Sequence, residues 1–300
     1  MTARQRAILN LLVEAYIQTG APVPSARVAE GTGLSPALAR YELIALEEMG
    51  YLTKPHASAG RVPTRQGFRQ YSLSLLPPKG LPPAVQERVE RALLGAREPE
   101  AFLVKVAAGL SGYPALLRLR PRKRPRLLQV HLSPLPEGTL AVLVLEGGRV
   151  KEARLPLTLS PARLKEAEEA LQGPFERLPK APSGLEDLFS ALERVLAQGL
   201  GQTYREGLAQ ALKEPEARDP AFLERLVQLY EAEGEDLLTP PGRVDVRVGE
   251  VEGVSAVQAG LARGEWTGEL VLLGPMRMRY PEALAVAYGL SQVYTEGHAG

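Results

Sequence analysis

The order of local patterns in residues 1–75 is the feature that most constrains what this chain can fold into. Residues 4–18 place apolar side chains at helical spacing, and Gly20 ends this predicted helix. An extended "APVP" connector follows, and Ser25 can cap a short helix that runs through Glu30. Two glycines then make a turn, because positive φ costs little only for glycine.

A third helix and a ribbon complete this pattern. Ser35 is a helix cap followed by proline at the first helical position, which predicts a helix to about Met49. "YLTK" and "RVPT" are short strand-like pieces, and Thr64 can cap the next helix. Helix, helix, turn, helix and two-stranded ribbon are together typical of a winged helix-turn-helix.

The charges are distributed unevenly along the chain. Residues 1–126 hold 19 Lys/Arg and 9 Asp/Glu, whereas residues 127–300 hold 17 and 26. A basic half favours a polyanionic ligand, although two unevenly charged solvated surfaces would give the same split.

Composition excludes several other classes of protein. The chain has no cysteine, which excludes disulfides, thiolate nucleophiles and Cys-ligated zinc. It has no uncharged apolar run of membrane-spanning length, and its first residues lack the pattern of a signal peptide. We therefore expect a soluble cytoplasmic protein. The Arg-rich, Asn-poor composition fits a thermostable protein or a GC-rich genome.

Beyond residue 75 the pattern predicts a mixed α+β organisation. Residues 83–117 indicate two helices, and the run "RLRPRKRPR" from Arg118 to Arg126 indicates an exposed linker that could also contact phosphates. Strands follow, with a hairpin turning at Gly147-Gly148. Helical patterns then dominate from Ser160, before strands and a last helix return. Strands, a helical block and more strands predict one α+β domain with an insertion.

A winged helix-turn-helix suits DNA, because a helix fits the major groove while a ribbon reaches the backbone or minor groove beside it. Arg40 and Tyr41 lie on the predicted outer face of the third helix and are the candidates to meet bases. Ser25, Arg27 and Ser35 are placed to hold phosphates at helix N-termini. The residues expected to contact DNA are Ser25, Arg27, Ser35, Arg40, Tyr41, Lys54, His56, Ser58, Arg61 and Arg65.

The segments "RQRAILNLLVEAYIQTGAPVPSARVAE" and "LSPALARYELIALEEMGYLTKPHASAGRVPTRQGFRQY" resemble the N-terminal domain of the heat-inducible transcription repressor family HrcA. "GYL..PH.SAGR.PT..G.R.Y" is its most specific signature. "VLLGPMRMRYPEALAVAYGL" is similar to the family's closing motif, so the resemblance extends over nearly the whole chain. The chain departs from the family pattern in two places. It has Leu38-Ala39-Arg40-Tyr41 where the family usually has Thr-Ile-Arg-Asn, so that Arg40 is kept but Tyr41 replaces an asparagine suited to adenine, and Pro24 replaces a glycine. The exact operator is therefore left open.

The resemblance implies a winged-helix domain at residues 1–75, a helical linker at 76–117, a GAF-like domain at 118–159 and 206–300, and an inserted dimerisation domain at 160–205. It also implies a homodimer that represses chaperone operons at an inverted-repeat operator, the CIRCE element, with help from the GroE chaperonin. The alternative is a ligand-responsive winged-helix regulator that senses a small molecule through its GAF-like domain.

We expect no enzyme, cofactor or metal site. His56 and Ser58 lie two residues apart without a third group to orient them, so they do not form a catalytic triad. His56, His131 and His298 are far apart in sequence and form no ligand motif. In the ribbon, Lys54, His56, Ser58 and Arg61 are expected to project toward phosphates; "HASAG" could instead serve folding or docking on a neighbouring domain.

Overall fold

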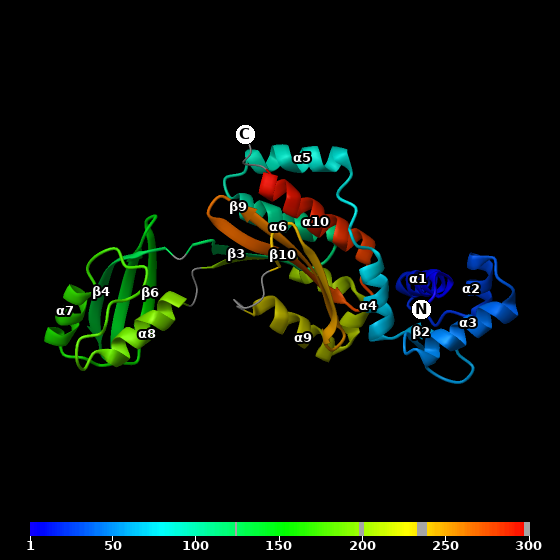
Figure 1. Ribbon diagram of the computed structural model, residues 1–300, viewed down its shortest axis with the longest axis horizontal. Helices are drawn as coiled ribbons and strands as arrows, with labels where there is room; N and C mark the ends of the chain where they lie inside the picture. The colour runs from blue at the N-terminus through cyan, green and yellow to red at the C-terminus, as the bar shows by residue number, and fades with distance from the viewer. Residues whose placement is uncertain (124, 198–200, 233–238, 297–300) are drawn as a thin grey trace. The chain divides into compact units, whose positions relative to one another are not determined.

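The computed structural model describes residues 1–123, 125–197, 201–232 and 239–296 (Figure 1). The chain divides into two units. Unit 1 comprises residues 1–118, 203–264 and 268–300, and unit 2 comprises residues 119–202 and 265–267. Both contain helices and antiparallel strands, which confirms the predicted α+β class. Within the described ranges, no helix combines the length and the apolar composition that crossing a bilayer requires.

Unit 1 begins with the predicted run of helices and a short ribbon. Its elements are α1 (Ala3–Thr19), α2 (Ser25–Thr32), α3 (Pro36–Glu48), β1 (Leu52–Thr53), β2 (Val62–Pro63) and α4 (Arg65–Ser74). β1 and β2 pair antiparallel, with Leu52 opposite Pro63. Gly20 ends α1 at φ 66°, a conformation that favours glycine. The element order predicted for residues 1–75 is therefore confirmed.

The remainder of unit 1 is built on a five-stranded sheet of order β7-β3-β10-β9-β8. Its strands are β3 (Ala115–Pro121), β7 (Gln202–Glu206), β8 (Val244–Val251), β9 (Val254–Arg263) and β10 (Trp266–Pro275). The helical elements are α5 (Pro83–Leu94), α6 (Pro99–Ser111), η1 (Leu208–Lys213), η2 (Pro215–Arg218), α9 (Pro220–Glu231) and α10 (Tyr280–Glu296).

Helices cover both faces of this sheet, with α10 on one face and α9 on the other (Figure 1). Two neighbouring residues of β9, Val254 and Ser255, point to opposite faces of the sheet. Val254 belongs to the apolar cluster that includes Phe222 and Leu226 of α9, whereas Ser255 accepts a hydrogen bond from the Tyr280 hydroxyl at the start of α10. Because successive side chains alternate across a strand, β9 contributes to two separate cores.

Unit 2 contains a three-stranded antiparallel sheet of order β4-β5-β6. Its elements are β4 (Leu127–Leu135), β5 (Gly138–Leu145), β6 (Arg149–Leu155), α7 (Pro161–Ala170) and α8 (Glu186–Ala197). The turn predicted at Gly147-Gly148 joins β5 to β6, with both glycines at positive φ. Leu132, Leu143 and Leu164 belong to one buried cluster, which joins the sheet to the helices.

The units are divided at other points than expected. Residues 119–159, expected with 206–300, lie with 160–202 in unit 2, because β4, β5 and β6 form a three-stranded sheet of their own. The exposed linker predicted from Arg118 is wrong for its first part. Residues 118–121 belong to β3, where Leu119 is buried and Arg118 forms an ion pair with the buried Glu269 at 3.5 Å. Residue 124 lies outside the described residues.

Candidate nucleic-acid interface

The two faces of α3 differ in the way the sequence predicts. Ala39, Leu43 and Leu46 are buried toward the rest of the helical segment. On the opposite side Arg40 is exposed, and the large side chains of Tyr41 and Ile44 are 69% and 43% exposed. Large apolar groups left in water on one helix face are a common mark of a contact surface.

The carboxylates of α3 differ in their surroundings. Glu42 is buried and accepts hydrogen bonds from Arg4 at 3.4 Å and from Gln5 at 3.1 Å. Glu47 pairs with Arg61 at 3.3 Å. The third acid, Glu48 at the end of the helix, is exposed. Two of the three acids of α3 are therefore paired with arginines, and Arg40 itself remains exposed.

The start of α3 is capped as predicted, whereas the start of α2 is not. The Ser35 hydroxyl accepts a hydrogen bond from the amide of Leu38 at 3.3 Å, and Pro36 occupies the first turn. Ser25, expected to cap α2, is instead its first helical residue, and the N-cap position is held by Pro24, which supplies no side-chain bond. Ser25 is half-buried and Arg27 is exposed.

The loop between β1 and β2 exposes three of the predicted contact residues. Lys54, His56 and Ser58 are all exposed. Nδ1 of His56 lies 3.2 Å from Oγ of Ser58, within hydrogen-bond distance. The loop therefore presents one flexible cation and a small polar pair to solvent, which is suitable for contact with phosphate oxygens.

Arg61 does not share this exposed surface, contrary to expectation. It is only 5% exposed, and its Nε donates to Glu47 of α3. Its backbone pairs with Val23 in the connector between α1 and α2, through two hydrogen bonds of 2.9 Å. Since a guanidinium held in this way cannot reach a ligand outside, Arg61 is better described as a residue that fixes the ribbon against α3.

Arg65 is also engaged within the protein. Its Nε donates to the carbonyl oxygen of Val248 in β8 at 2.9 Å. The side chain at the start of α4 thus attaches the helical segment to the five-stranded sheet. Of the ten residues expected at the interface, Arg61 and Arg65 are those whose guanidinium groups bond elsewhere in unit 1.

The described residues include no group of three or more His, Asp or Glu side chains arranged to hold a metal ion. His56 lies in the β1–β2 loop and His131 in β4. His298 lies outside the described residues.

Known proteins resemble this chain along nearly its full length. A family model described as the HrcA protein C terminal domain matches residues 103–284. A heat-inducible transcription repressor HrcA of Synechococcus sp. (strain CC9902) is 33% identical, and the match covers 94% of each chain. The protein of that name from Moorella thermoacetica is 29% identical over 95% of this chain and 94% of its own.

A crystal structure described as that of a hypothetical protein superposes with a TM-score of 0.53 at 23% identity. It covers 99% of both chains and shows that the overall fold is shared. The class to which the comparisons assign the chain is that of the transcription repressors. Within that class it belongs to the HrcA family, whose curated members are named heat-inducible transcription repressors.

Proposed function

We propose that this protein represses heat-shock operons encoding chaperones by binding an inverted-repeat, CIRCE-type operator as a cytoplasmic homodimer. Residues 1–75 act as a winged helix-turn-helix in this proposal. Family membership supports repression, and one structural observation supports the mode of binding. Arg40, Tyr41 and Ile44 form an exposed face on α3, and the carboxylates of Glu42 and Glu47 in the same helix are paired with Arg4 and Arg61.

The proposed contacts follow from the chemistry of these side chains. Arg40 suits the O6 and N7 acceptors of guanine in the major groove, and Ile44 suits the methyl group of thymine. Tyr41, on the same face of α3, offers an aromatic ring and a hydroxyl group. Lys54 and the polar loop around it are suited to phosphates, as are Ser25, Arg27 and Ser35 at the starts of α2 and α3.

The proposal also assigns roles to unit 2 and to the five-stranded sheet of unit 1. Unit 2 contains the dimerisation surface, and the five-stranded sheet of unit 1 is the GAF-like domain. A two-fold dimer matches two operator half-sites. Heat lowers the population of the competent dimer, and the GroE chaperonin restores it, so that operator occupancy follows that population.

A binding titration tests the proposal. Wild type is titrated with an inverted-repeat operator and with a scrambled duplex of equal length, at several salt concentrations. Arg40→Ala should cost roughly 1–3 kcal/mol on the operator and reduce discrimination, because base readout is lost. Lys54→Ala should weaken both duplexes and reduce the salt slope by about one.

Arg97→Ala is the matched control. Arg97 is exposed in the connector between α5 and α6, outside residues 1–75, and its removal should leave operator affinity and salt slope unchanged. Equal affinity of the wild type for operator and scrambled duplex would contradict sequence-specific repression.

One observation favours a second candidate, a regulator that senses a small molecule. The amide Oε1 of Gln258 and Nε of Arg118 are buried in the five-stranded sheet without a hydrogen-bond partner among the described residues, and Oε1 of the buried Glu269 has an ion pair with Arg118 but no hydrogen bond there. Burial lowers the pKa of Arg118, although the charge of Glu269 opposes this. Buried polar groups of this kind are usually satisfied by a partner. A metabolite that raises the melting temperature and shifts operator affinity would favour this candidate.

A further inference from the structure

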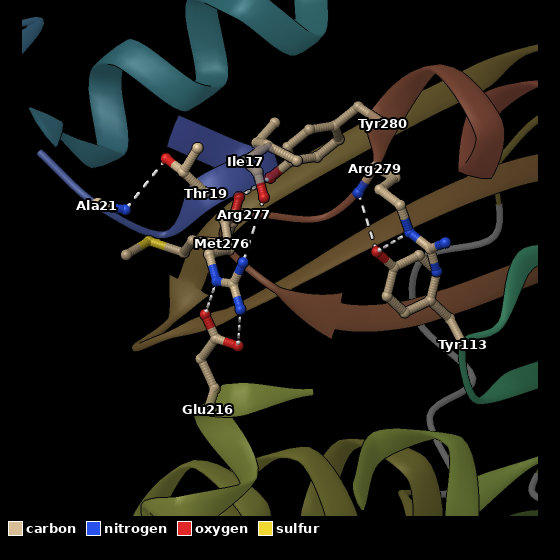
Figure 2. A network of polar contacts seen from close by, with 9 residues as sticks. All are labelled: Ile17, Thr19, Ala21, Tyr113, Glu216, Met276, Arg277, Arg279 and Tyr280. Carbon is tan, nitrogen blue, oxygen red and sulfur yellow. Dashed lines mark hydrogen bonds and ion pairs between the residues drawn. The ribbon is translucent and has the colours of Figure 1, made fainter. Parts of the chain in front are cut away.

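A single arginine of the β10–α10 connector links the start of the chain to the body of unit 1. Arg277 forms a two-pronged ion pair with Glu216 of η2, through Nε with Oε1 and through Nη2 with Oε2 at 3.2 Å. Its Nη1 donates to the carbonyl oxygen of Ile17 in α1 at 3.2 Å. Figure 2 shows the guanidinium between these two partners, Ile17 and Glu216, which lie far apart in the sequence.

The contact completes the C-terminal end of α1. The last carbonyls of a helix lack partners within the helix and carry partial negative charge, which a nearby cation stabilises. The last turn of α1 contains no basic residue of its own. Arg277 supplies that cation, and it lies so close to the helix end that a Cβ added to Gly20 would be 3.8 Å from its Nη1.

The ion pair is partly shielded from water. The side chains of Arg277 and Glu216 are 16% and 28% exposed. A two-pronged pair between guanidinium and carboxylate has a fixed geometry. Because the pair is shielded from water, solvent screens its attraction less than it screens that of an exposed surface pair. The arrangement is therefore suited to holding α1 in one orientation.

A second arginine in the same connector offers a natural comparison. Arg279 donates to the hydroxyl of Tyr113 through its backbone at 2.9 Å and to the carbonyl of Ser111 through Nη2 at 3.2 Å. Both partners follow or end α6, outside residues 1–75 (Figure 2). Arg277 and Arg279 thus have similar surroundings in the chain but different targets, and only Arg277 bonds to α1.

The docked arrangement leaves the candidate interface open. Docking uses Ile17 at the end of α1 and Arg65 at the start of α4, whereas Arg40, Tyr41 and Ile44 remain exposed on α3. The contacts that hold residues 1–75 to the sheet are therefore compatible with a recognition helix presented to a ligand.

We propose that Arg277 is a positioning residue for operator binding, which fixes the direction in which each protomer presents α3. This inference rests on the proposed function. When one dimer binds both half-sites, the second binding event is intramolecular. The affinity gained from it depends on how closely residues 1–75 of each protomer are held in the required orientation. A loosely attached residue 1–75 segment would still bind one half-site but would lose part of that advantage.

The test compares full-length variants on three duplexes: the inverted repeat, a single half-site and a scrambled sequence. Arg277→Met should weaken binding to the inverted repeat about tenfold while changing half-site binding less than about twofold. Arg277→Lys keeps the cation beside α1 but not the two-pronged pair, so it should recover part of the loss. Glu216→Gln should show a smaller selective loss, since it removes the carboxylate and leaves the bond to Ile17.

Arg279→Met is the matched control and should keep the wild-type ratio of inverted-repeat to half-site affinity. Equal weakening on both duplexes by Arg277→Met, or an unchanged ratio, overturns the positioning role. The same ratio loss in Arg279→Met also overturns it, because the effect then belongs to the connector as a whole. A wild type without preference for the inverted repeat over the scrambled duplex refutes the proposed function itself, and the inference with it.

Discussion

At the scale of single residues, Arg61 shows how a structural cation can be mistaken for a ligand contact. It lies in a short segment with Lys54, His56 and Ser58, and all four were expected to project from the ribbon. Lys54, His56 and Ser58 are exposed, but Arg61 is buried against Glu47. Sequence shows that these residues are polar and close together. It does not reveal that the backbone of Arg61, just before β2, pairs with Val23 and that its side chain meets Glu47 of α3.

The stability of variants distinguishes the two roles. Arg61→Ala removes a buried group with a charge-assisted hydrogen bond and should lower the free energy of unfolding by roughly 1.5–3 kcal/mol. Lys54→Ala removes an exposed side chain and should change it by less than about 0.5 kcal/mol. Urea unfolding followed by circular dichroism measures both.

If Arg61→Ala unfolds like the wild type but binds all duplexes more weakly, Arg61 contacts DNA after all.

At the scale of elements, most predictions based on local signals were confirmed, the cap expected at Ser25 being an exception, whereas those that needed a distant partner were not. The helix stop at Gly20, the Ser35 cap and the hairpin at Gly147-Gly148 each depend on a few neighbouring residues. By contrast, β3 was not predicted: the sequence indicates two helices in residues 83–117, the second disrupted at Gly112 and Pro114, and a linker from Arg118, whereas residues 115–121 form a strand. A short apolar run fits both structures, and the strand forms because β10 and β7 flank it from positions far along the chain.

The same distinction between local and tertiary signals applies to the candidate interface. Periodicity was sufficient to predict which face of α3 is exposed, because helical spacing is a local property. It could not predict the partners of Arg61 or Arg65, nor the contact between Arg277 and Ile17, because these depend on tertiary packing. Exposure of the interface was therefore predictable, whereas the interactions that orient it were not.

Two helix caps in residues 1–75, Ser35 and Thr64, should contribute different amounts to the free energy of unfolding. Ser35 forms one bond, to the amide of Leu38, at an exposed position. The Thr64 hydroxyl accepts from the amide of Gly67 at 3.1 Å and also donates to the carbonyl of Gly50 at 2.6 Å, which connects α4 to the end of α3. Ser35→Ala should cost about 1 kcal/mol, and Thr64→Ala more, about 2 kcal/mol, because two bonds are lost.

Urea unfolding followed by circular dichroism gives both values. Thr64→Ser retains the hydroxyl and should stay within about 0.5 kcal/mol of wild type. If Thr64→Ala costs no more than Ser35→Ala, the bond to Gly50 contributes nothing to stability.

At the scale of the whole molecule, the described residues form two sheets besides the β1–β2 ribbon, and the strands of the three-stranded sheet lie between β3 and β7 in the sequence of the five-stranded one. The strand–helix–strand pattern predicts an insertion, and its expected start is residue 160. In the structure unit 2 begins earlier, at Leu119. The local sequence pattern identifies β4, β5 and β6 as strands but does not identify the strands with which they pair, so it could not assign them to either sheet. Pairing assigns them to unit 2, and the chain therefore leaves the larger sheet after β3 and returns to it at β7.

The points of exit and return lie close together. A Cβ added to Gly201 would approach the carbonyl oxygen of Leu119 to 2.9 Å, and β3 neighbours β7 in the sheet. A loop of about four residues can join neighbouring strands of this kind. Replacement of residues 122–201 by such a loop should therefore leave the five-stranded sheet and residues 1–75 folded.

The shortened protein tests where the dimer forms. If unit 2 contains the dimerisation surface, light scattering should show a monomer where the full chain gives a dimer. The monomer should bind a single half-site as the full chain does, within about twofold, because α3 is unchanged. It should lose the additional affinity for the inverted repeat, since the second half-site is no longer reached intramolecularly. A shortened protein that remains a dimer would place the interface in unit 1 and would contradict the role proposed for the insertion.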